Sequence, residues 1–135
     1  MNTVTQLPDL SEKPSVMSKN EVESVFIQIM DAAESNFELK PLDVLEALDE
    51  AISAQGYTES PYDEAISLRI FNWIKAHWVF GDYEFANVAL TSLVNIDCHG
   101  RDAYILELIQ RESDQGVVTE LAESHAEIIN LIKNN

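Results

Sequence analysis

The sequence is poor in cysteine, glycine, proline and basic residues, and each shortage excludes a class of protein. A single cysteine, Cys98, cannot form an internal disulfide, which excludes a small disulfide-stapled scaffold. Four glycines and four prolines in 135 residues are too few for a collagen-like or low-complexity chain. The glycines also stand apart, at positions 56, 81, 100 and 116, so no glycine-rich phosphate-binding loop is present.

The shortage of basic residues is the most informative of these features. Eight Lys and Arg face 24 Asp and Glu, which gives a formal net charge of −16. The basic residues occur singly, whereas binding to nucleic-acid phosphates or to an anionic membrane requires them in clusters. We therefore expect neither direct nucleic-acid binding nor membrane binding. An acidic surface attracts basic proteins or cations, and it also keeps a small protein soluble, so both interpretations stay open.

Long apolar runs are absent as well. No run approaches the roughly 20 apolar residues that cross a bilayer, and the first 20 residues do not combine a positive start with an apolar stretch, as a signal peptide does. Together with the single cysteine, this predicts a cytoplasmic protein. Hydrophobic residues nevertheless make up 46% of the chain, which is a globular composition and enough for one core.

The chain divides into a short arm and one helical domain. Residues 1–17 contain Pro8 and Pro14 without an apolar period, which predicts a flexible N-terminal arm. Residues 18–135 follow a helical period almost throughout, and no segment alternates long enough to be a strand. The predicted helices span about 19–35, 41–55, 61–80, 83–96 and 101–112, with a sixth after Gly116. Ser18 with Glu21 forms a capping box, and Asp82 is a candidate N-cap. Links of a few residues predict antiparallel neighbours.

One stretch carries a resemblance to a known architecture. The sequence from Trp73 to Ile96, WIKAHWVFGDYEFANVALTSLVNI, resembles a HEAT-type hairpin, with a long helix, a Gly-Asp turn and a second helix rich in small residues and leucine. The resemblance implies an all-α stack of antiparallel helical hairpins. An irregular helical bundle has the same spacing, so both arrangements stay open.

Histidines are the first candidates for chemistry. His77 and His125 fall on apolar helix faces, so we expect both to face the core. There they could bind zinc together with Cys98 or His99, since zinc accepts nitrogen and sulfur ligands. No two of these residues have a spacing typical of metal ligands, however, and partly buried structural histidines are common. We therefore assign no metal, no cofactor and no catalytic residue.

Carboxylate side chains are the most abundant candidates for a functional site. Asp43, Glu46 and Glu50 occur at i, i+3 and i+7 and so share one helix face, with Asp49 beside them. Glu46, Asp49 and Glu50 resemble half of the magnesium-binding set of all-helical nucleotide pyrophosphatases, which implies a Mg-dependent nucleotide hydrolase as an alternative. Asp63 and Glu64 would complete that set, although acidic residues in a first helical turn already favour the helix dipole. Residues 19–65 hold 12 acids and 2 bases, a density that repels a phosphate substrate.

A non-catalytic binding function fits the sequence better than an enzyme. Small acidic helical proteins of this type resemble immunity proteins and inhibitors that mask nuclease toxins, or mimics that occupy a DNA-binding groove. The resemblance implies a basic protein partner, steered by charge and anchored by exposed aromatic residues. A structural or adaptor subunit, either monomer or homodimer, is a further alternative. The candidate contact residues are Asp43, Glu46, Asp49, Glu50, Asp63, Glu64, Tyr57 and Tyr83.

Overall fold

The protein is all-α. The structure, a computed structural model, describes residues 6–9, 17–54 and 62–133. Its six helices are α1 (Lys19–Ser35), α2 (Pro41–Ala54), α3 (Glu64–His77), α4 (Tyr83–Asn95), α5 (Arg101–Arg111) and α6 (Gln115–Lys133). The described ranges contain no β-sheet. The predicted fold class, about six helices in antiparallel hairpins, is therefore confirmed.

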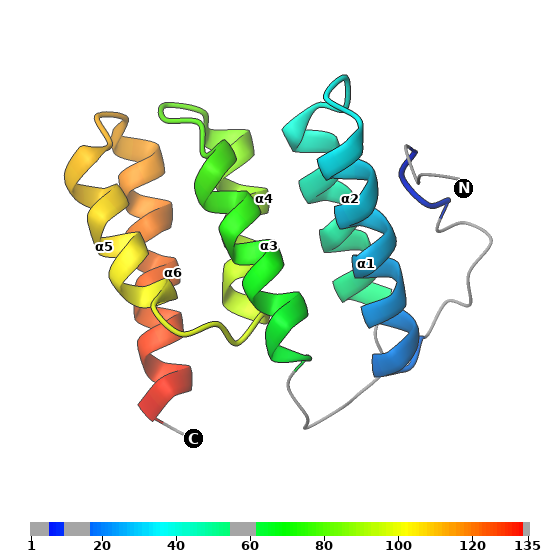
Figure 1. Cartoon of the computed structure of the whole chain (residues 1–135). Helices are drawn as coiled ribbons and strands as arrows, with labels where there is room; N and C mark the ends of the chain where they lie inside the picture. Colours follow the sequence, from blue (N-terminus) through cyan, green and yellow to red (C-terminus); the bar gives the residue numbers. More distant parts are fainter. Residues whose placement is uncertain (1–5, 10–16, 55–61, 134–135) are drawn as a thin grey trace.

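The helices form three hairpins that stand side by side (Figure 1). The hairpins are α1–α2, α3–α4 and α5–α6, and their turns lie at one end of the molecule. Helices α1, α3 and α5 form one layer, here called the odd layer, and α2, α4 and α6 form the even layer behind it. In the even layer α4 packs between α2 and α6, which joins the hairpins into one body.

Local signals determine where the helices begin. The Ser18 hydroxyl accepts from the Glu21 N–H at 3.2 Å, and the Glu21 carboxylate accepts from the Ser18 N–H at 3.1 Å, so the predicted capping box forms. Asp82 accepts from the Phe85 N–H at the start of α4, as predicted. Gly81 and Gly100 have φ angles of 77° and 92°, a left-handed conformation that favours glycine.

Helix α3 ends earlier than the sequence predicts. Apolar residues continue to Phe80, but α3 ends at His77 and Trp78 is already extended, with φ −57° and ψ 133°. The ring of Trp78 packs edge-on against Phe85 at 5.5 Å and against Tyr104 at 6.3 Å. Contacts with α4 and α5 thus decide where the chain leaves the helix, and a periodic pattern does not contain that information.

Every helix contributes to one core. Buried apolar side chains from the six helices include Phe26, Leu45, Ile74, Phe85, Ile105 and Leu121. Met17, the last residue of the predicted arm, is also buried, and its N–H donates to the Ala54 carbonyl at 2.7 Å. Residues 1–5 and 10–16 of that arm lie outside the described residues. In the described part of the chain, no helix has both the length and the apolar character needed to cross a membrane.

Candidate partner-binding surface

Charge in this protein is divided between the two helical layers. Helices α2, α4 and α6 carry eight Asp and Glu and a single base, Lys133, at the last position of α6. Helices α1, α3 and α5 carry seven Asp and Glu together with five Lys and Arg. The sequence shows an acidic N-terminal half, but the fold redistributes this charge into an acidic layer and a more balanced one.

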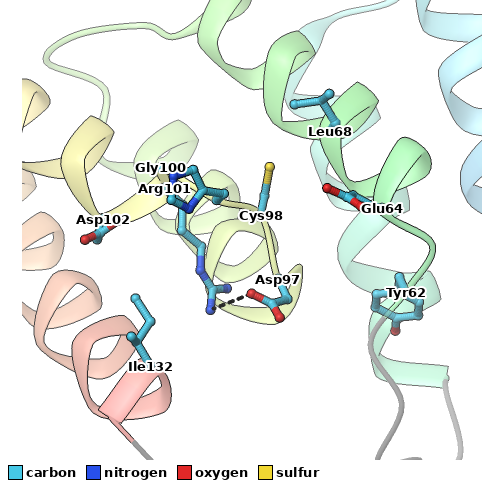
Figure 2. Close-up of a pocket in the computed structure, with 10 residues that line it drawn as sticks. Tyr62, Glu64, Leu68, Asp97, Cys98, Gly100, Arg101, Asp102 and Ile132 are labelled. Atoms are coloured by element: carbon cyan, nitrogen blue, oxygen red, sulfur yellow. Dashed lines mark ion pairs between the residues drawn. The ribbon is translucent and has the colours of Figure 1, made fainter. Parts of the chain in front are cut away.

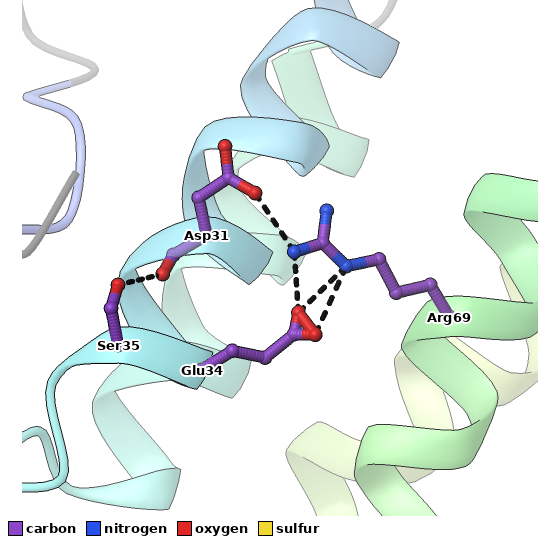
Figure 3. A network of polar contacts seen from close by, with 4 residues as sticks. All are labelled: Asp31, Glu34, Ser35 and Arg69. Atoms are coloured by element: carbon purple, nitrogen blue, oxygen red, sulfur yellow. Dashed lines mark hydrogen bonds and ion pairs between the residues drawn. The ribbon is translucent and has the colours of Figure 1, made fainter. Parts of the chain in front are cut away.

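The odd layer neutralises part of its charge through ion pairs. Arg69 on α3 reaches across to α1, where its guanidinium pairs with Asp31 at 2.8 Å and also with Glu34 (Figure 3). These bonds raise the pKa of Arg69 above its ordinary value, the bond to Glu34 having the largest effect. On α5, Arg111 pairs with Glu107 at 3.7 Å. The four ion pairs found among the described residues include none from the helices of the even layer.

The predicted carboxylates of α2 lie on the solvent side of the even layer. Asp43, Glu46 and Glu50 are exposed and Asp49 is half-buried, whereas Leu45 and Leu48 on the opposite side are buried. The placement of these four side chains on one polar face follows the predicted spacing. Their function as contacts for a partner remains a prediction.

The other predicted acidic residues lie elsewhere. Asp63 is the N-cap of α3, where its carboxylate accepts from the N–H groups of Ala65 and Ile66 at 3.0 and 3.2 Å. Glu64 follows in the first turn of α3, in the odd layer. The fold does not bring this pair onto the exposed face of α2, so the candidate contacts do not form one continuous set.

Of the two predicted tyrosines, only Tyr83 belongs to the described residues. Tyr57 lies outside the described residues. Tyr83, at the start of α4, is 50% exposed, and its hydroxyl donates to the Glu120 carboxylate on α6 at 3.0 Å. This bond, with the nearby negative charge of Glu120, raises the pKa of Tyr83 above its ordinary value. Tyr83 thus connects the predicted residues with a part of α6 that the sequence analysis did not select.

A groove of about 280 Å³ runs between α4 and α6 on the even layer. We call it the α4–α6 groove. The α4 side is formed by Asn87, Leu90, Thr91, Val94 and Asn95, and the α6 side by Glu120, Glu123, Ser124 and Glu127. One wall thus carries amides and a hydroxyl, and the other carries carboxylates.

The sequence analysis missed the acidic wall of this groove, although a signal was present. Glu120, Glu123 and Glu127 have the same i, i+3 and i+7 spacing as Asp43, Glu46 and Glu50 on α2. The six residues therefore form two parallel acidic stripes, because α2 and α6 both belong to the even layer and run in the same direction (Figure 1). The polar residues of α4 lie between the two stripes.

A larger cavity, of about 460 Å³, lies between the start of α3, the link after α4 and the end of α6 (Figure 2). Its lining includes Tyr62 and Cys98. Burial, followed by the charge of Glu23, raises the pKa of Tyr62 to about 12. Burial also raises the pKa of the Cys98 thiol, which opposes its conversion to a nucleophilic thiolate. Arg101, also in the lining, bonds the end of α4 through one guanidinium nitrogen, and its other terminal nitrogen lies 3.9 Å from the Asp97 carboxylate.

The histidines do not come together. His77 is exposed, contrary to the sequence prediction that it faces the core, because it lies at the end of α3. Its ring stacks on Trp73 at 4.3 Å, and its Nδ1 atom lies 2.8 Å from the Trp73 carbonyl oxygen. His125 is half-buried on α6. Among the described residues, no three His, Cys, Asp or Glu side chains are arranged to hold a metal ion.

Large apolar side chains are exposed at the end of the molecule where the hairpins turn. Phe37 in the α1–α2 turn is 93% exposed, and Val79 and Phe80 in the α3–α4 turn are 41% and 38% exposed. Both turns lie at the same end in Figure 1. Aromatic residues exposed in this way are typical of anchors at protein interfaces.

Comparisons of this chain with protein-family models, with curated proteins and with solved structures gave no match.

Proposed function

We propose that this protein is a non-catalytic binding module whose even layer grips a basic protein. The observation that carries the proposal is the unneutralised charge of that layer, with eight carboxylates, one terminal lysine and no ion pair among its described side chains. Like charges held close together repel and lower the stability of the fold, and a cationic partner relieves that repulsion on binding. The chemistry is that of an immunity- or inhibitor-type protein.

The partner class follows from the same charge. A nuclease toxin or a DNA-binding protein presents a basic surface to nucleic acid, and an acidic helical layer is complementary to that surface. Charge steers the approach and raises the association rate, whereas anchoring needs desolvated apolar contacts. Tyr83 on α4 and the phenylalanines Phe37 and Phe80 in the hairpin turns are exposed and supply candidate anchors.

The test compares charge reversal on the two layers. Glu46→Lys with Glu50→Lys removes charge from the even layer at exposed positions without ion pairs. Glu38→Lys with Glu107→Lys changes the net charge equally at exposed positions outside that layer. The second of these changes also removes the exposed pair of Glu107 with Arg111, and such a pair contributes about 0–1 kcal/mol to stability. Each tagged protein is incubated with a lysate of its own host cells, washed at low and then at high salt, and the released proteins are identified by mass spectrometry.

We expect a basic protein to be captured by the native chain and by the control, and to be released by salt. With the purified partner, the even-layer variant should associate about tenfold more slowly and with a weaker salt dependence, because steering by charge accelerates association by about 10 to 10³-fold. An equal loss in both double variants would assign the effect to net charge alone. Unchanged association in the even-layer variant would reject the proposed surface.

A further inference from the structure

The two walls of the α4–α6 groove carry different hydrogen-bonding groups, and these groups determine which kind of ligand can bind. On the α4 wall part of the donor capacity is already used, because the Thr91 hydroxyl donates to the Asn87 carbonyl at 3.1 Å and one N–H of the Asn95 amide donates to the Thr91 carbonyl at 2.7 Å. The side-chain oxygens of Thr91 and Asn95 receive no hydrogen bond from a described residue. Hydroxyl and amide oxygens accept hydrogen bonds, so this wall offers acceptors to whatever occupies the groove.

The opposite wall offers acceptors that are also charged. Glu123 and Glu127 form no ion pair with a described residue, and Glu120 accepts one hydrogen bond from Tyr83. An ionised carboxylate only accepts hydrogen bonds. A cation with several N–H donors directed to opposite sides can therefore satisfy the oxygens of both walls.

The volume of the groove and the residues at its base limit the kinds of ligand that can bind there. Small-molecule sites usually enclose about 300–1,000 Å³, and this groove, at about 280 Å³, lies below that range. Val94, which is half-buried, adds apolar surface between the polar walls, whereas Leu90 beneath it is buried. A long side chain with an apolar stem and a cationic head fits such a site, with the methylene groups over Val94 and the head between the walls.

Arginine fits this arrangement better than lysine. Its planar guanidinium carries five N–H donors in a rigid fork, so it can bind a carboxylate along one edge and neutral oxygens along another. A lysine ammonium has three donors at one point and is more strongly hydrated. We propose that the α4–α6 groove binds arginine side chains of the basic partner. This proposal rests on the proposed function and names the chemistry by which the even layer recognises its partner.

The length of the groove sets the number of arginines. Seven residues separate Glu120 from Glu127, which corresponds to about 10 Å along the helix axis. Side chains two residues apart in an extended segment are separated by about 6.6 Å. Two arginines at positions i and i+2 of the partner can therefore lie in the groove together, each near one turn of α6.

The test uses short peptides with the full chain. The probes are N-acetylated, C-amidated peptides of sequence Ala-Arg-Ala-Arg-Ala, its Lys counterpart and its citrulline counterpart, which keeps the shape of arginine without the charge. Binding is followed by NMR through the side-chain amide resonances of Asn87 and Asn95, which report on the groove directly. The variant Glu123→Gln with Glu127→Gln removes the charge and preserves side-chain size. Glu46→Gln with Glu50→Gln is the matched control on α2.

We expect the arginine peptide to shift the resonances of Asn87 and Asn95 and to bind several-fold more tightly than the lysine peptide. The citrulline peptide should bind far more weakly than either. The groove variant should weaken binding of the arginine peptide about fivefold to tenfold, because it removes two partly exposed carboxylate partners of the guanidinium groups. The α2 control should change the affinity less than twofold.

Three outcomes overturn the proposal: no binding of the arginine peptide, equal affinity for the arginine and lysine peptides, or an equal loss in the groove variant and the α2 control. The folded state of each variant is checked by the dispersion of its backbone amide resonances.

Capture from the lysate distinguishes a failure of the arginine-binding proposal from a failure of the proposed function. If the groove does not bind arginine but the even layer does bind a basic protein, the groove variant captures that protein like the native chain, while Glu46→Lys with Glu50→Lys loses it. If the proposed function fails, neither variant affects capture from the lysate, whatever the peptides show.

Discussion

At the scale of single residues, Arg101 is a charged side chain that is buried and hydrogen-bonded to the backbone. Its side chain is buried, and one guanidinium nitrogen donates to the carbonyls of Leu93 and Val94 at 2.7 and 2.9 Å, and to that of Ile96. These carbonyls belong to the last turn of α4 and the residue that follows it, where no further helical N–H is available to satisfy them. Burial lowers the pKa of Arg101 below its ordinary value, and the carbonyl bonds replace part of the hydration that burial removes.

The change Arg101→Met should therefore destabilise the protein by about 2–4 kcal/mol, because charge-assisted bonds are lost and buried carbonyls are left without donors. The measurement is the free energy of unfolding in urea, followed by circular dichroism. Arg111→Met is the control, since Arg111 forms an exposed pair with Glu107 at 3.7 Å, and such pairs contribute about 0–1 kcal/mol. Equal losses in the two variants would contradict the assigned role of Arg101.

At the scale of helices and turns, Glu112 ties the second hairpin to the third. Glu112 is the C-cap of α5 and is only 8% exposed. One carboxylate oxygen accepts from the N–H of Gly81 in the α3–α4 turn, and the other accepts from the N–H groups of Ser113 and Asp114, all at 2.9 Å. A single side chain thus satisfies backbone donors from two turns that are 31 residues apart in the sequence.

Replacing this carboxylate by an amide should loosen both turns together. In Glu112→Gln one oxygen becomes an NH₂ group that faces backbone N–H donors, so we expect a loss of about 1–3 kcal/mol. Hydrogen exchange should accelerate at the Gly81 and Ser113 amides before it changes at buried α4 amides such as that of Ala89. Glu107→Gln, at an exposed position on the same helix, serves as the control. Uniform acceleration along the chain would indicate global destabilisation instead of a local link.

At the scale of the whole molecule, the layered charge makes stability depend on salt. The Debye length falls from about 30 Å at 0.01 M to about 8 Å at 0.15 M ionic strength, so salt screens the repulsion within the even layer. We expect the melting temperature to rise with added sodium chloride over this range. Glu46→Gln with Glu50→Gln should raise stability at low salt by about 0.5 kcal/mol, because it removes a like-charge pair at i, i+4. That gain should shrink at high salt.

The odd layer provides the opposite control. Glu34→Gln also removes a negative charge, but it weakens the contact with Arg69 and so should lower stability. Thermal unfolding by circular dichroism at both salt concentrations distinguishes the two effects. Stabilisation by both changes would mean that net charge alone, and not its division between layers, controls stability.

Much of the secondary structure could be predicted from the sequence. Capping residues and turn glycines act on backbone only a few residues away, so their effects can be predicted without knowledge of the fold. Examples are Ser18, Asp82, Gly81 and Gly100. The sequence predicted an end of α3 near Phe80, but the helix ends at His77, because Trp78 packs against Phe85 of the next helix and against the more distant Tyr104 of α5. For the same reason the exposure of His77 did not follow from its position on an apolar face.

The candidate site shows the same division between local and long-range information. The acidic face of α2 follows from a spacing of three and four residues, which any helix converts into a stripe. The stripe on α6 has the same spacing, but its meaning depends on α4, which is close to α6 only in the folded chain. By itself the sequence determined six helices, the starts of α1 and α4 and a strongly acidic character, because caps and periodicity act locally. The start of α3 was predicted near residue 61, but Asp63 is the N-cap and the helix begins at Glu64. Only the tertiary structure decided that Arg69 pairs with two carboxylates of α1 while α2 and α6 share one layer without ion pairs, because that outcome depends on which helices become neighbours.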